Sequence, residues 1–528
     1  MADQTLKHKI GQMIIAGFPS PYVDDQAKRL VENYHVGNFA LFGRNYVNAE
    51  QVAEMCNGLH QLTYAKNGYS AYLASDQEGG VVSRVCIGSA LFPGTMAMAA
   101  SPSADPYQVG KNCGNILGSL GILGNFGPVL DVNLDPMNPI IGSRSYSDDP
   151  ETVARMGVDM IRGLHDGGLL ATLKHFPGHG NVATDSHLGN PVNTTPKEEL
   201  MRTEFMPFQR AFDAGADAIM TAHVIYEDID PVYPGTVSKK IMTDLLRDTM
   251  HFEGFAITDC MEMDAIKVTY GIGPGAIMAI NAGCDMLCFS HTYEAVAEAC
   301  EALYKAVEDG TLSMDRINES YERIVRLKKQ YHLVEPPVVD TANALKWLSD
   351  RQIMDFHAKI SRDSMTMISD DGGFEALKNA KHPRFFAPES IASTGAEDKE
   401  RAPTRFHELA QKRFGGDAVQ IPMSSVDEAT LEAIRSKDYD VAVLALYNAR
   451  FRESQQIILR ELEAQDRPLV VLLLGAPYDA ALIRNAKCVI CAYEYTYLAA
   501  EALLAAMETG EFKGHLPVQL PKELPSKV

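Results

Sequence analysis

Short apolar runs alternate with helical patterns along the first 330 residues of the chain. Eight runs have the length of buried strands, and most are followed by stretches in which apolar residues recur every three or four positions. One such stretch is 199–214, where Phe205, Phe208 and Phe212 keep this spacing. The predicted strands are Met13–Phe18, Asn38–Gly43, Ala71–Asp76, Gly124–Asn133, Leu170–Phe176, Ala218–His223, Phe255–Cys260 and Met286–His291. Eight alternations of strand and helix predict an α/β fold, the (β/α)8 TIM barrel.

The pattern changes after a long predicted helix at 314–331. A proline-containing stretch follows at 335–340, and 341–363 is again helical in pattern. Six further strand-like runs then appear: Met365–Ser369, Arg384–Ala387, Ala418–Met423, Val441–Tyr447, Leu469–Leu474 and Cys488–Tyr493. We predict a barrel domain at 1–335, a linker and connecting helix at 336–363, and a smaller three-layer αβα domain at 364–528.

The composition and net charge of the chain indicate which classes of binding partner are not expected. The chain has 528 residues, of which 46% are hydrophobic and 22% charged, and its formal net charge is -21. Nucleic acids and anionic membranes attract basic surfaces, so neither is an expected partner. The N-terminus carries no secretory or transmembrane pattern, and we expect a cytoplasmic protein with reduced, buried cysteines. The oligomeric state is left open.

Residues 174–187 collect basic and acidic side chains directly behind a predicted strand. Pro177, Gly178 and Gly180 favour a loop rather than a helix. In a TIM barrel the chemistry lies at the C-terminal ends of the strands, where this loop begins. The segment therefore predicts a functional site, to which it contributes Lys174, His175, His179, Asp185 and His187.

Two positions have the chemistry of glycoside cleavage. Asp259 ends a predicted strand and is a candidate nucleophile for a sugar's anomeric carbon, the alternative being a carboxylate that caps the next helix. His187, oriented by Asp185, is a candidate proton donor, the alternatives being a metal ligand or a surface residue. No zinc-type ligand spacing is present, so we expect neither a metal nor an organic cofactor. Glu262 and Asp264 are expected on a helix that turns away from the site.

Other polar residues near the strand ends supply donors and acceptors for a ring of hydroxyl groups. The expected ligand is therefore a small carbohydrate. The candidate substrate-binding residues are Asp76, Arg84, Asp131, Arg144, Lys174, His175, His179 and His223.

Several segments, in order along the chain, resemble glycoside hydrolase family 3 and in particular its NagZ-like β-N-acetylglucosaminidase branch. They are Asp76–Gly80 with Arg84, Gly127–Asn133, Asn138–Tyr146, Lys174–Gly180, Asp185–His187 and Ile257–Asp259. Gly514–Val518 resembles the family's usual C-terminal strand. The chain departs from the family pattern at Val81 and at Cys260–Met263, which bears on the fine shape of the pocket.

The resemblance implies retaining hydrolysis of terminal, non-reducing β-linked N-acetylglucosamine, from muropeptides or chitin oligosaccharides. It assigns the glycosyl-enzyme bond to Asp259 and acid/base catalysis to His187 with Asp185. Glucosidase branches of the family use a glutamate from another domain as acid/base, so the resemblance favours N-acetylglucosamine over glucose. Three alternatives remain open: a phosphorylase that yields the sugar 1-phosphate, a β-glucosidase, and a non-catalytic sugar-binding barrel.

Overall fold

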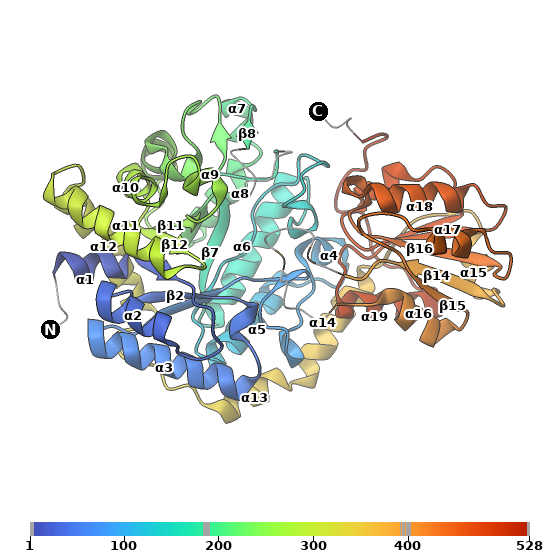
Figure 1. Ribbon diagram of the computed structural model, residues 1–528, viewed down its shortest axis with the longest axis horizontal. Helices are drawn as coiled ribbons and strands as arrows, with labels where there is room; N and C mark the ends of the chain where they lie inside the picture. The colour runs from blue at the N-terminus through green and yellow to red at the C-terminus, as the bar shows by residue number, and fades with distance from the viewer. Residues whose placement is uncertain (1–4, 183–190, 391, 393–396, 398–402, 525–528) are drawn as a thin grey trace.

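The computed structural model describes residues 5–182, 191–390, 392, 397 and 403–524. Its first part is a closed barrel of eight parallel strands, blue to green in Figure 1. In barrel order the strands are β1 (Ile14–Ala16), β2 (Asn38–Leu41), β3 (Tyr72–Ser75), β6 (Gly124–Asn125), β7 (Leu170–Phe176), β9 (Ala218–Thr221), β11 (Phe255–Cys260) and β12 (Met286–Phe289). Pairing of β12 with β1 closes the barrel, which confirms the predicted TIM-barrel fold.

Six of the eight barrel strands are shorter than predicted, and the difference is largest for β6 and β1. The run at 124–133 contains only the two-residue β6, because Pro128 has no backbone N–H to give to a ladder. The chain beyond it keeps a single bridge, between Val129 and Lys174. β1 is likewise three residues long. Shortening β6 leaves 126–147 as an irregular segment above the barrel, and this segment carries two of the candidate site residues.

An outer layer of helices surrounds the strands (Figure 1). The predicted helix at 199–214 divides into α7 (Lys197–Leu200) and α8 (Phe205–Asp213). The π-helix η5 (Lys240–Thr249) follows β9. The others are α1 (Leu6–Gln12), α2 (Asp25–Tyr34), α3 (Ala49–Asn67), α4 (Thr95–Ala100), α5 (Pro106–Ser119), α6 (Pro150–Asp166), α9 (Asp264–Lys267), α10 (Ile272–Ala282), α11 (Tyr293–Glu308) and α12 (Met314–Gln330).

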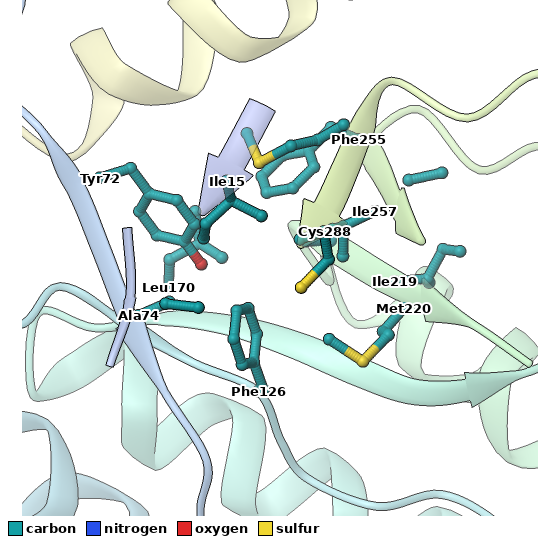
Figure 2. Close-up of a cluster of buried hydrophobic side chains, with 14 of the residues drawn as sticks. Ile15, Tyr72, Ala74, Phe126, Leu170, Ile219, Met220, Phe255, Ile257 and Cys288 are labelled. Atoms are coloured by element: carbon teal, nitrogen blue, oxygen red, sulfur yellow. The ribbon is translucent and has the colours of Figure 1, made fainter. Parts of the chain in front are cut away.

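Apolar side chains from the strands fill the inside of the barrel. Figure 2 shows Tyr72, Leu170 and Phe255 pointing toward one another from strands around the ring. Strand side chains alternate between the two faces, so each strand sends every second residue inward. The interior of the barrel is therefore a packed core.

A second sheet forms a separate domain, coloured orange to red in Figure 1. Its order is β13-β18-β17-β16-β14-β15, parallel except for the edge strand β13. The strands are β13 (Thr366–Asp370), β14 (Pro383–Ala387), β15 (Asp417–Gln420), β16 (Val441–Leu446), β17 (Leu469–Leu473) and β18 (Cys488–Cys491). Helices α15 (Gly373–Lys378), α16 (Phe406–Phe414), α17 (Glu428–Arg435), α18 (Glu453–Glu463) and α19 (Tyr497–Thr509) accompany them.

Alternate residues of β16 enter two different apolar clusters. Leu444 packs in the cluster that contains Ile458 of α18, and Val443 packs in the one that contains Leu503 of α19. Helices thus cover both faces of the sheet, which confirms the predicted three-layer αβα domain.

The two domains are joined by α13 (Thr341–Leu348) and α14 (Arg351–Asp363), so the predicted connecting helix is broken once. Met96 of α4 belongs to the core of the second domain. The expected strand at Gly514–Val518 is wrong: the segment has no strand pairing, and Pro517 removes one donor from it. No helix in the described part of the chain combines the length and apolar character needed to cross a bilayer.

Candidate active site

A cavity of about 590 Å³ opens at the C-terminal ends of the barrel strands. Its size is typical of small-molecule sites. Phe126, Met220 and Cys288 belong both to its lining and to the core shown in Figure 2, and they form its floor. Seven predicted site residues line it: Asp76, Arg84, Arg144, Lys174, His175, His179 and Asp259.

Asp76 and Lys174 meet at the ends of β3 and β7. Lys174 Nζ lies 2.7 Å from Asp76 Oδ1, and Arg84 Nη2 lies 3.2 Å from Asp76 Oδ2. Burial alone would raise the pKa of Asp76, but Lys174 and Arg84 outweigh this and hold the pKa well below its usual range. The carboxylate is therefore ionised at neutral pH and can accept hydrogen bonds from ligand hydroxyl groups.

Glu78 is a cavity residue that the sequence analysis missed. It lies on β4 (Gln77–Gly79), which forms a short hairpin with β5 (Val82–Ser83). Arg144 donates to both of its carboxylate oxygens, at 2.9 and 2.8 Å, and Lys174 Nζ lies 2.5 Å from Oε1. Bidentate pairing of this kind fixes the guanidinium plane. Glu78 thus orients two cations that face the cavity.

Asp131 lies beneath the cavity instead of lining it. The carboxylate is fully buried and accepts hydrogen bonds from His175 Nδ1 at 2.6 Å and from the backbone N–H of His179 at 2.7 Å. Burial would raise the pKa of Asp131, but His175 more than offsets this and lowers it. The carboxylate therefore sets the orientation of the His175 ring and the start of the following loop.

His179 is a poor proton donor in this setting. Burial, reinforced by the neighbouring His175, lowers the pKa of His179 to about 4. Its imidazole is consequently neutral at pH 7. A proton donor in this cavity therefore has to be another group.

Asp259 is placed at the end of β11, on the cavity wall. Its Oδ1 accepts a hydrogen bond from the backbone N–H of Cys260 at 2.6 Å. It is partly exposed to the cavity and is not a helix cap, because the next helix, α9, starts at Asp264 with Met263 as its cap. This geometry favours a reactive carboxylate over a capping one.

The expectation that Glu262 and Asp264 turn away from the site is wrong. Both line the cavity, since the helix begins only at Asp264. Glu262 accepts hydrogen bonds from the backbone N–H groups of His291 and Thr292, at 2.7 and 3.1 Å. It therefore ties the loop after β11 to the loop after β12.

His223 is not among the cavity-lining residues. It is buried, with Nδ1 2.7 Å from Thr236 Oγ1 and Nε2 3.1 Å from the carbonyl oxygen of Cys260. Both ring nitrogens have protein partners, so the side chain supports the loop behind Asp259. Asp185 and His187 lie outside the described residues.

The second domain reaches the cavity and the loops around it. Glu397 lines the cavity, with its Oε2 3.0 Å from the hydroxyl group of Tyr447, and no sequence pattern near it indicated this. Buried Arg450 donates from Nε to the carbonyl oxygen of Pro136 at 2.9 Å, on the segment that carries Arg144. The second domain therefore steadies part of the ligand-binding wall.

No group of three or more His, Cys, Asp and Glu side chains suited to a metal ion occurs among the residues that the structure describes. Five of the charged groups that line the cavity are paired with one another. Two carboxylates and three cations form one connected set, made of Asp76, Glu78, Arg84, Arg144 and Lys174.

Known proteins share both the sequence and the fold. The model of the glycosyl hydrolase family 3 N-terminal domain matches residues 5–327. A β-hexosaminidase A from Pseudoalteromonas piscicida is 29% identical over 388 residues, which is 69% of this chain and 64% of that relative's length. A β-hexosaminidase from Pseudomonas aeruginosa is 34% identical over 264 residues, 49% of this chain and 76% of the relative.

A solved structure matches almost the entire chain. The family 3 β-N-acetylglucosaminidase from Paenibacillus sp. str. FPU-7 superimposes with a TM-score of 0.91 at 32% sequence identity. The match covers 99% of this chain and 100% of that one. The similarity therefore includes the second domain as well as the barrel.

Proposed function

Because the chain belongs to glycosyl hydrolase family 3, we propose that this glycoside hydrolase is a retaining exo-β-N-acetylglucosaminidase. The observation that carries the proposal is the cavity at the strand ends, where Asp259 shares the wall with the paired charges around Asp76 and Lys174. The cavity is closed below by Phe126 and Met220, which suits the end of a sugar chain better than its middle.

The first chemical step is attack on the anomeric carbon. A carboxylate oxygen of Asp259 forms a bond to that carbon while the bond to the leaving oxygen breaks. His187, in its protonated form, gives its proton to the leaving oxygen, and Asp185 stabilises the imidazolium before transfer. The product of this step is a covalent glycosyl-enzyme with neutral His187.

The second step reverses these roles. Neutral His187 takes a proton from water, and the resulting hydroxide equivalent attacks the anomeric carbon and displaces Asp259. Two inversions give net retention of the β configuration. Meanwhile the cations held by Glu78 and Asp76 bind the hydroxyl groups and keep the ring in place.

The proposed preference of this protein for N-acetylhexosamine is supported by its relatives, which are named β-hexosaminidase and β-N-acetylglucosaminidase. Natural substrates of this kind are muropeptides and chitin oligosaccharides. The cavity has charged and polar groups above its apolar floor, and the aromatic side chain of Phe42 also lines it, which fits a compact polar sugar.

Product analysis tests the proposal directly. We expect p-nitrophenyl β-N-acetylglucosaminide, incubated with the protein in phosphate buffer, to yield free N-acetylglucosamine by mass spectrometry. Early proton NMR spectra are expected to show the β-anomer before mutarotation. N-acetylglucosamine 1-phosphate would instead identify a phosphorylase, and an initial α-anomer would contradict the double displacement.

Glu78→Gln is expected to lower kcat/KM by about 10²-fold. The change leaves Arg144 and Lys174 with one carboxylate fewer, and misplacement of binding groups by about 1 Å costs a factor of this order. Steady-state kinetics on the aryl glycoside measure it. Glu151→Gln is the matched control, because the Glu151–Arg210 pair lies on the surface with both side chains more than half exposed. Equal losses in the two variants would show that Glu78 does not position the binding groups.

A further inference from the structure

A fully buried carboxyl group lies below the loop that follows β7. Glu204, the residue just before α8, is 0% exposed. Its Oε2 accepts a hydrogen bond from Asn193 Nδ2 at 2.8 Å, and the backbone N–H of Asn181 also donates to the carboxyl group. Within the described part of the chain, Oε1 has no hydrogen-bond partner. Buried polar atoms rarely lack a hydrogen-bond partner, so Oε1 of this carboxyl group is an exception.

The two partners of Glu204 flank the acid/base segment. Asn181 precedes Asp185 and His187 in the sequence, and Asn193 follows them. A second link joins the same two stretches, because Asn181 Nδ2 donates to Thr195 Oγ1 at 2.9 Å. One buried side chain therefore contacts both ends of the segment that the mechanism needs.

Glu204 also packs tightly against the loop that connects β7 to Asn181. A Cβ atom built on Gly178 would lie 2.7 Å from Glu204 Cβ, so the loop backbone rests directly on this side chain. The hydroxyl group of Tyr226, on β10 (Ile225–Tyr226), donates to the carbonyl oxygen of Gly178. β10 in turn pairs with β8 (Val192–Asn193). Movement of Glu204 would disturb each of these contacts.

The charges that face Glu204 are acidic. They are Asp131 from the segment after β6 and Glu199 from α7, while β10 contributes the phenol of Tyr226. Burial first, and then Asp131 and Glu199, raise the pKa of Glu204 to about 8, although the hydrogen bonds from Asn193 and Asn181 oppose the shift. The group is neutral where the enzyme is expected to work and ionises in mild alkali.

We propose that Glu204 is a positioning residue that holds the two ends of the acid/base segment together while its carboxyl group is neutral. Ionisation would place a negative charge beside Asp131, on an oxygen that has no donor, and a buried charge in that state is costly. Gly178, Asn181 and Asn193, which contact Glu204, would then shift to admit donors. The inference rests on the proposed function, since it takes His187 to be the acid/base.

The pH profile of kcat/KM tests the inference. In the wild type, loss of the His187 proton gives an alkaline limb of slope -1, and above pH 8 ionisation of Glu204 steepens it toward -2. We expect Glu204→Gln to keep its activity at pH 6.5 and to retain a slope of -1 up to pH 10. At pH 9 the relative activity of the variant then exceeds that of the wild type by about tenfold, the factor that one pH unit beyond a pKa produces. Identical slopes in both proteins would overturn the proposal.

Glu199→Gln is the matched control, because this exposed side chain is close enough to act on Glu204 by charge alone. Removing its charge lowers the pKa of Glu204, so the steepening is expected at a slightly lower pH with neutral activity unchanged. If the slope steepens at the same pH as in the wild type, or if the steepening vanishes, a group other than Glu204 causes it.

A measurement without activity separates this inference from the proposed function. Hydrogen exchange of peptides spanning 181–193 is compared between wild type and Glu204→Gln at the same pH, so that intrinsic exchange rates cancel. We expect equal exchange at pH 6.5 and faster exchange in the wild type at pH 9. If Glu204→Gln does not fold, Asn193→Ala removes one link, and faster exchange at pH 6.5 is the expected result. No difference in exchange would refute the positioning role even if the protein hydrolyses N-acetylglucosaminides.

Discussion

Asp259→Asn is expected to lower kcat on an aryl β-N-acetylglucosaminide by about 10⁴-fold or more, because an amide cannot form the glycosyl-enzyme bond. The change is nearly isosteric, and the amide oxygen of the new side chain can still accept the hydrogen bond that the backbone N–H of Cys260 gives to Asp259 Oδ1. Stopped and steady-state assays of p-nitrophenol release measure the loss. Asp248→Asn, on the exposed face of η5, is the matched control with unchanged kinetics.

Two further tests distinguish a nucleophile from other roles of Asp259. Asp259→Ala opens space for azide, which would attack from the same face of the sugar and give the α-glycosyl azide. His187→Ala is expected to recover on a substrate with a more acidic phenol, since protonation of that leaving group is less important. Recovery of Asp259→Asn on the same substrate, or retention of more than a tenth of wild-type kcat, would assign Asp259 another role.

The order of elements along the chain was predictable because each has a local signal. Apolar runs at strand spacing and apolar residues at helical spacing indicated the barrel and the second domain, and the strand-end rule of TIM barrels brought Asp76, Lys174, His175 and Asp259 together. The order of the elements follows from periodicity, and the gathering of these four residues follows from topology. Neither prediction requires knowledge of which side chains are in contact.

Contacts between distant segments were not predictable in the same way. Glu78 binds Arg144, 66 residues away, from a hairpin that extends past its strand. Glu397 enters from the other domain. His223 lies two residues beyond the end of β9, and its ring is held by Thr236 and the Cys260 carbonyl. A strand end fixes where a residue lies, whereas its neighbours decide whether it faces the ligand.

The opposite end of the barrel holds a buried charged cluster. Asp285, which directly precedes β12, is fully buried and accepts hydrogen bonds from Arg247 of η5 and from Arg316 and Arg323 of α12, at 2.8, 2.8 and 3.0 Å. The backbone N–H of Ala256 on β11 donates to the same carboxylate at 3.0 Å. One side chain thus joins two barrel strands to two outer helices.

Asp285→Asn is expected to destabilise the protein by about 3–5 kcal/mol, because it leaves three arginines around a neutral amide. Urea unfolding followed by circular dichroism measures the change. Asp159→Asn is the matched control: its pair with Arg162 is on the surface, at 3.8 Å, and is expected to contribute at most about 0.5 kcal/mol. Equal unfolding midpoints for Asp285→Asn and the wild type would mean that the cluster does not hold the barrel together.

The difference in unfolding free energy between the wild type and Asp285→Asn is expected to change with pH in one direction. Burial would raise the pKa of Asp285, but Arg247, Arg316 and Arg323 outweigh it and lower the pKa in the folded state. As the pH falls, Asp285 is therefore protonated in the unfolded chain before it is protonated in the folded protein. The stabilisation is complete above the ordinary aspartate pKa of about 4. It is lost as the pH falls through the lower, folded-state pKa. The gap between wild type and Asp285→Asn is accordingly expected to be constant from pH 5 to 7 and to narrow below pH 4, whereas a gap that widens in acid would contradict the ionised cluster.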